Sequence, residues 1–163
     1  MILYNVPSRT GLSFTAETYQ ILSQYENING VKEASGDFSL IAKTAALCGD
    51  SLNIWSGNDD QIVPMMALGA KGVISVASNI CPKAIKGLAA AYLSGDTSRA
   101  AAVQLQYLPL MEALFSEVNP IPIKAAMEAL GLDSGYLRLP LCQMSPEKRE
   151  ALCGLLDDYL PEV

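Results

Sequence analysis

This 163-residue sequence contains no histidine, so any proton transfer must use Lys, Tyr, Asp, Glu or Cys side chains. A Ser-His-Asp or Cys-His arrangement and a His-ligated metal are therefore excluded. Lys32 is the first candidate, because it lies among small and apolar residues in Gly-Val-Lys-Glu-Ala-Ser-Gly. An amine buried there would be neutral and could attack a ketone. The alternative is a solvated surface lysine, which is the commoner state of a lysine beside a glutamate.

The cluster Asn58-Asp59-Asp60 allows two interpretations. Neighbouring carboxylates attract Ca²⁺ or Mg²⁺. Asp59 or Asp60, directly ahead of an expected helix, would also cap its open backbone amides. We favour the cap and expect no metal site.

Short apolar runs alternate with amphipathic segments in the first part of the chain, which predicts an α/β fold with parallel strands. The expected strands are residues 2–6, 30–34, 52–56 and 72–76, and the expected helices between and after them are 15–24, 39–47, 61–68 and 82–93. Beyond residue 95 only helices are expected, at 98–115, 122–130 and 146–159. We therefore divide the chain into a half-barrel of four βα units, residues 1–94, and a helical region, residues 95–163.

The first strand is unusual, because Met1 leads directly into the apolar run of residues 2–6. Four parallel strands cannot close a barrel, and an open apolar edge invites pairing with another chain. We interpret the sequence as a fragment of a barrel. In parallel barrels the active site lies at the carboxyl ends of the strands.

Composition limits the kinds of molecule that this chain is expected to bind and the compartment in which it is expected to lie. The formal net charge of −6 argues against nucleic acid and anionic membranes as partners. No apolar stretch reaches the roughly 18 residues of a membrane span, and there is no signal-peptide pattern. The four cysteines form no Cys-x-x-Cys pair, which is typical of reduced thiols in a cytoplasmic protein.

Two longer strings carry a resemblance: Tyr-Asn-Val-Pro-Ser-Arg-Thr-Gly at residues 4–11 and Val-Lys-Glu-Ala-Ser-Gly at 31–36. With further matches at 56–60, 69–75, 119–124 and 137–140, nearly the whole chain resembles the dihydrodipicolinate synthase family. The related sialic acid lyases and sugar-acid aldolases usually differ around the tyrosine and lysine. Arg9-Thr10-Gly11 favours the dihydrodipicolinate branch.

The resemblance implies the C-terminal half of a TIM (β/α)8 barrel, followed by a helical extension. It implies a class I aldolase-type lyase that condenses pyruvate with aspartate semialdehyde in lysine and diaminopimelate biosynthesis. Lys32 corresponds to the Schiff-base lysine and Tyr4 to the tyrosine that relays protons. Arg9 corresponds to the arginine that recognises aspartate semialdehyde, Ile74 to a residue whose carbonyl faces pyruvate, and Gly57 to a close backbone approach beside it. No cofactor is expected, because the lysine amine is itself the catalytic handle.

The N-terminal half of the family's barrel has no counterpart here, and it carries two threonines and a dimer-interface tyrosine of the site. We therefore expect the isolated half to be weakly active or inactive. One alternative is a non-catalytic half-barrel that forms a homo-oligomer or pairs with a complementing N-terminal half-barrel. Another is a sialic acid or sugar-acid aldolase of the same superfamily.

Overall fold

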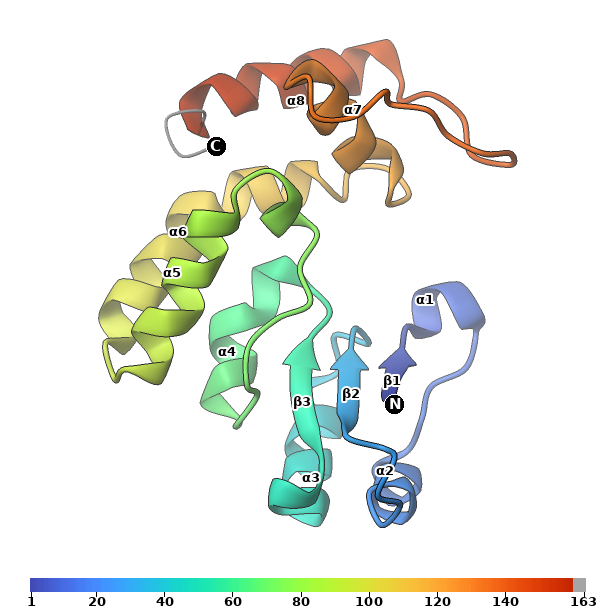
Figure 1. Cartoon of the computed structure of the whole chain (residues 1–163), viewed down its shortest axis with the longest axis vertical. Helices are drawn as coiled ribbons and strands as arrows, with labels where there is room; N and C mark the ends of the chain where they lie inside the picture. Colours follow the sequence, from blue (N-terminus) through green and yellow to red (C-terminus); the bar gives the residue numbers. More distant parts are fainter. Residues whose placement is uncertain (160–163) are drawn as a thin grey trace. The chain divides into compact units, whose positions relative to one another are not determined.

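The computed structural model describes residues 1–159, which fall into two compact units. The first unit is Met1–Ser75 and contains every strand found in the described residues (Figure 1). The second unit begins at Val76 and is built from helices. All five candidate site residues lie in the first unit.

The sheet of the first unit has three parallel strands in the order β1-β2-β3. Their bounds are Ile2–Asn5, Gly30–Glu33 and Asn53–Ser56. Tyr4 pairs in register with Lys32, and Lys32 pairs with Trp55. Because side chains alternate along a strand, this row lies on one face of the sheet and the next row lies on the other.

Four helices and two short 3₁₀ turns accompany the sheet: α1 (Pro7–Thr10), α2 (Ala16–Leu22), α3 (Phe38–Cys48), α4 (Ile62–Ala67) and the turns Gly49–Ser51 and Asp59–Gln61. Thr15 caps α2 by accepting a hydrogen bond from the Thr18 amide, as the sequence predicts. Helices α2 and α3 pack together and are joined by the Lys43–Glu17 ion pair. Tyr19 of α2, Ile41 of α3 and Val31 of β2 are fully buried and belong to the core of this unit.

The expectation of a fourth strand at residues 72–76 is wrong. This segment forms one isolated parallel bridge, between Ser56 and Val73. The Ser56 amide donates to the Gly72 carbonyl and the Ile74 amide donates to the Ser56 carbonyl, both at 2.9 Å. A 3₁₀ turn begins at Ala77, so too few residues run beside β3 to build a ladder. The described fold is α/β with three parallel strands.

The second unit consists of a 3₁₀ turn (Ala77–Asn79) and four helices: α5 (Pro82–Leu93), α6 (Thr97–Ala113), α7 (Ile121–Ala129) and α8 (Pro146–Tyr159). Helices α5 and α6 pack as a hairpin, and α7 packs on α8. Asp96 caps α6 by accepting from the Arg99 amide. The segment after α7 is held to it by an ion pair of 2.7 Å between Lys124 and Asp133.

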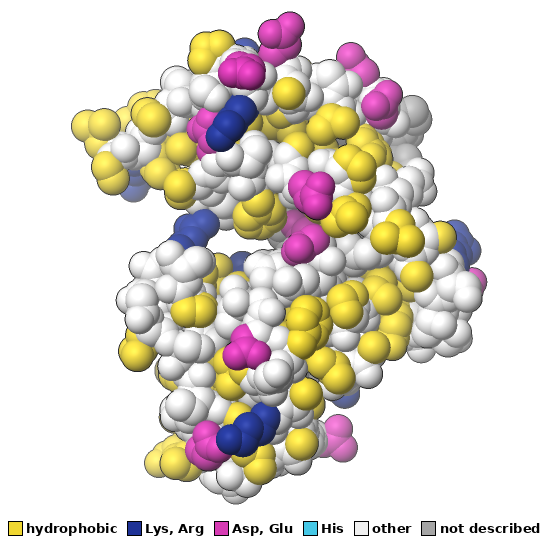
Figure 2. Space-filling view, turned by 180° about the vertical axis from the view of Figure 1, so that it is seen from behind, with side chains coloured by type: hydrophobic (Ala, Val, Ile, Leu, Met, Phe, Trp, Pro, Cys, Tyr) yellow, Lys and Arg dark blue, Asp and Glu magenta, His cyan; other side chains and the backbone are white. Residues whose placement is uncertain are grey.

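The surface carries several large hydrophobic side chains, including Ile2 (50% exposed) and Tyr4 (47%) of β1. On the face shown in Figure 2, the Lys and Arg side chains lie apart from one another among acidic and apolar ones. None of the helices within residues 1–159 is both long enough and apolar enough to span a bilayer.

A substitution of Gly30, at the start of β2, tests how closely β3 packs against β2. A Cβ there would collide with the Asn53 carbonyl oxygen and with the Trp55 ring. We expect Gly30→Ala to lower the free energy of unfolding by about 1–3 kcal/mol, the usual cost of overpacking. Gly87→Ala in α5 is the matched control, because a Cβ there meets nothing within 4 Å; it should be stabilising by about 0.5–1 kcal/mol. Denaturant unfolding measures both, and equal effects would contradict the close β2–β3 contact.

Candidate active site

Lys32 and Tyr4 form the centre of the candidate site. They lie side by side near the carboxyl ends of β2 and β1, with the Lys32 Nζ 4.5 Å from the centroid of the Tyr4 ring. An ammonium at this distance is attracted by the ring face. Lys32 is half-buried and Tyr4 is exposed, so both can be reached from solvent.

Gly57 brings the end of β3 close to the lysine stem. Its amide donates to the Glu33 carbonyl oxygen at 2.7 Å. A Cβ at position 57 would lie 2.6 Å from the Ala34 Cβ and 3.2 Å from the Lys32 Cε. The alanine contact cannot be relieved by a side-chain rotation, so this approach requires glycine.

The other two candidate residues are placed less closely. Ile74 is tied to the end of β3 through its amide bond to Ser56 and is 38% exposed. Arg9 lies in α1, the short helix that follows β1 and that ends at Gly11 in a left-handed conformation. Tyr4 thus lies against Lys32, Gly57 is bonded to Glu33 beside it, Ile74 is bonded to Ser56, and Arg9 follows β1 along the chain. Helix α1 itself is not anticipated by the sequence.

A buried polar row lies on the opposite face of the same strand ends, and sequence reasoning missed it. Asn5, Glu33 and Ser56 pair in register and are 1%, 2% and 0% exposed. The Tyr19 hydroxyl donates to Glu33 Oε2 at 3.0 Å. Burial, and then the charge of Glu33, raises the pKa of the Tyr19 phenol well above its usual range. The sequence feature that could have predicted this row is the alternation of side chains along a strand, which places Glu33 on the other face of the sheet from Lys32.

Asp59 and Asp60, which the sequence predicts as the cap of a helix, stand just ahead of α4. Both residues lie inside the 3₁₀ turn that precedes α4, and the cap position of α4 is Gln61. The extra turn shifts the helix start beyond the acidic pair. Within residues 1–159, no group of three or more His, Cys, Asp or Glu side chains is arranged to hold a metal ion.

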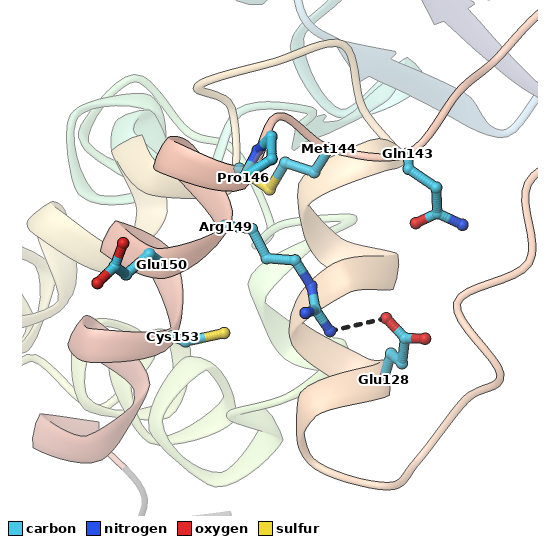
Figure 3. A pocket seen from close by; sticks show the side chains of 7 residues that line it. All are labelled: Glu128, Gln143, Met144, Pro146, Arg149, Glu150 and Cys153. Carbon is cyan, nitrogen blue, oxygen red and sulfur yellow. Dashed lines mark hydrogen bonds and ion pairs between the residues drawn. The ribbon is translucent and has the colours of Figure 1, made fainter.

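The second unit contains a hollow of about 450 Å³ (Figure 3). Figure 3 shows Arg149 of α8 and Glu128 of α7 pointing toward one another across it, joined by a hydrogen bond of 2.9 Å. Cys153 also lines the hollow. The cation here is already neutralised by its partner, and none of the candidate site residues lies in this hollow.

Parallel strands followed by helices, with a lysine and a tyrosine at their carboxyl ends, define an α/β protein that corresponds to part of a TIM barrel. The profile of the Dihydrodipicolinate synthetase family matches residues 1–158, and the chain belongs to this family.

Curated relatives agree with this membership. A 4-hydroxy-tetrahydrodipicolinate synthase of Clostridium novyi is 48% identical over 159 residues, and one of Thermoanaerobacter sp. is 51% identical over 160 residues. Each alignment covers 98% of this chain and 54% of the relative. The chain therefore spans about half the length of the curated relatives it matches.

Solved structures of dihydrodipicolinate synthases also match this chain over about half of their length. Dihydrodipicolinate synthase from Aquifex aeolicus is 41% identical, with a TM-score of 0.95 over 99% of this chain and 56% of that one. A chloride-inhibited dihydrodipicolinate synthase from Acinetobacter baumannii, complexed with pyruvate, is 36% identical with a TM-score of 0.93. That match covers 99% of this chain and 55% of the other.

The raised pKa of Tyr19 predicts an alkaline transition. Because the folded phenol holds its proton more tightly than the unfolded one, its contribution to stability is complete below about pH 10 and is lost as the pH rises above that value. We expect Tyr19→Phe to flatten this loss, while Tyr25→Phe, at a 57% exposed site, leaves it unchanged. Chemical unfolding at a series of alkaline pH values measures it. An unchanged alkaline slope in Tyr19→Phe would contradict the assignment.

Proposed function

We propose that this chain is the pyruvate-binding, C-terminal half of a 4-hydroxy-tetrahydrodipicolinate synthase. In this proposal residues 1–94 form the half-barrel that carries the Schiff-base lysine, and residues 95–163 form the helical extension. The single observation that carries the proposal is the Lys32 amine beside the Tyr4 ring at the carboxyl ends of adjacent parallel strands, in a chain of this family. The pyruvate complex of the Acinetobacter baumannii relative supports the choice of substrate.

The proposed chemistry begins with attack of the Lys32 amine on the ketone carbon of pyruvate. A carbinolamine forms and loses water to give the imine, with the carbonyl oxygen leaving as that water. Tyr4 is the proposed proton relay of this step, and its ring centroid lies 4.5 Å from the lysine amine. The enamine formed from the imine would then attack the aldehyde carbon of aspartate semialdehyde.

The remaining candidate residues take binding roles in the proposal. The Arg9 guanidinium suits the carboxylate of aspartate semialdehyde, because it can donate two parallel hydrogen bonds. Gly57 keeps the backbone close to the lysine, and Ile74 offers backbone groups at the neighbouring strand end. Since the chain spans about half the length of its relatives, we expect it to form the imine more readily than it completes the condensation.

Trapping with borohydride tests the imine. The chain is incubated with pyruvate, reduced, digested and analysed by peptide mass spectrometry. We expect a reduced pyruvyl adduct on Lys32. Lys32→Arg should abolish the labelling, and Lys71→Arg, a matched lysine of the same unit, should leave it intact. A full-length relative serves as the positive control. An unlabelled Lys32 beside a labelled control would contradict the proposed function.

A second candidate function is that of a non-catalytic half-barrel that associates with another copy or with a complementing half. The observation that favours it is the edge strand β1, where Ile2 and Tyr4 are half-exposed beside a row of open backbone groups. An apolar edge strand of this kind is a template for pairing with another strand.

Light scattering distinguishes these states. We expect the chain to form an oligomer without substrate, and we expect Ile2→Lys to shift it toward monomer by placing a charge on the edge. Leu93→Lys, at a 66% exposed position in the other unit, is the control and should leave the mass unchanged. Synthase activity on mixing with a separate N-terminal half of a relative would support the lyase. A wild-type chain that remains a clean monomer would contradict association.

A further inference from the structure

The carboxylate of Glu33 accepts several hydrogen bonds next to the candidate site, and the proposed chemistry leaves it unused. It is 2% exposed and directly follows Lys32. Asn5 Nδ2 lies 3.0 Å from both of its oxygens, the Tyr19 hydroxyl donates to Oε2 at 3.0 Å, and the Ser35 amide donates to Oε1 at 2.8 Å.

These donors come from three different parts of the first unit. Asn5 ends β1, Tyr19 lies in α2, and Ser35 lies in the loop after β2. Among the described residues, no Lys or Arg forms an ion pair with Glu33. The buried charge is therefore held by neutral dipoles, each of which is directional and tolerates little displacement.

The orientation of Asn5 is itself fixed. The Phe14 amide donates to its Oδ1 at 3.3 Å, and its Nδ2 also lies 3.1 Å from the Ser13 hydroxyl oxygen. The Asn5 amide group therefore presents its donor side to Glu33. Rotating the group would place its oxygen against the carboxylate and would lose the bond from Phe14.

Two backbone bonds extend this arrangement to the reactive face. The Ala34 amide donates to the Asn5 carbonyl at 2.9 Å, and the Gly57 amide donates to the Glu33 carbonyl at 2.7 Å. The ends of all three strands are thus joined through residues 33 and 34. Tyr4 and Lys32, one residue earlier on the opposite face, take their separation from these joined strand ends.

We propose that Glu33 is a positioning residue for the reaction of Lys32: its buried carboxylate, bound by Asn5, Tyr19 and Ser35, fixes the lysine amine against the Tyr4 ring. As a statement about catalysis the inference rests on the proposed function. The geometric part of the inference, that Glu33 fixes the place of the Lys32 amine, does not depend on the proposed function. Two readouts are therefore needed, one with pyruvate and one without.

Two variants disturb the carboxylate by different means. In Glu33→Gln the new NH₂ group faces Asn5 Nδ2 in either orientation of the amide, because that nitrogen lies equally close to both oxygens. Tyr19→Phe removes one donor and adds no clash. Tyr25→Phe, an exposed tyrosine that follows α2, is the matched control.

The first readout is reductive ¹³C-methylation of the lysine amines, observed by NMR without pyruvate. The Lys32 dimethylamine signal, assigned by its loss in Lys32→Arg, should be displaced by the Tyr4 ring current in the wild type and in Tyr25→Phe. It should move toward the position of an exposed lysine in Glu33→Gln and Tyr19→Phe. The second readout is the rate of borohydride trapping with pyruvate, which should fall between roughly tenfold and a hundredfold in Glu33→Gln, as expected for a misplaced reacting group.

Circular dichroism at the assay temperature identifies the variants that fold. If Glu33→Gln does not fold, Tyr19→Phe alone tests whether Glu33 positions Lys32. An undisplaced Lys32 signal in the wild type, or a wild-type signal in the folded variants, would overturn the inference. Failure of the wild type to trap pyruvate, with the NMR response intact, would instead refute the proposed function and leave the positioning of Lys32 by Glu33 supported.

Discussion

The buried carboxylate of Glu33 is the constraint on which the candidate site depends. A charge taken out of water is costly unless its hydrogen bonds are made, and here Asn5, Tyr19 and Ser35 supply them. Since those donors belong to β1, α2 and the loop after β2, satisfying one side chain brings these three parts together. The low exposure of the row Asn5, Glu33 and Ser56 reflects its place between the strands and the helices.

The alternation of side chains along β2 connects this constraint to chemistry. Lys32 and Glu33 are neighbours in sequence and point to opposite faces, so the carboxylate secures the strand end while the amine stays half-buried beside Tyr4. Gly57 completes the arrangement by letting the end of β3 approach the lysine stem. Family membership and this geometry together support a Schiff-base role for Lys32.

Sequence reasoning predicted the features that depend on local pattern. The α/β fold, the starts of the three strands within a residue and the Thr15 cap follow from apolar periodicity and from capping chemistry. The prediction of a fourth strand was wrong because a strand requires continuous pairing with its neighbour. The segment around Val73 pairs with β3 at one bridge only. A 3₁₀ turn at Asp59–Gln61 moves the start of α4 one residue beyond the predicted position. The partners of Glu33 stayed hidden because cross-strand register and the reach of Tyr19 are set by tertiary packing.

In this structure the Tyr4–Lys32 pair is already formed before any substrate binds. The most direct measurement is an NMR search, on protein with ¹³C-labelled lysine, for nuclear Overhauser effects between the Lys32 side chain and the Tyr4 ring protons in the absence of pyruvate. We expect these cross-peaks, because the amine lies 4.5 Å from the ring centroid. A Lys32 side chain with no contact to the ring and the chemical shifts of a solvated lysine would contradict it.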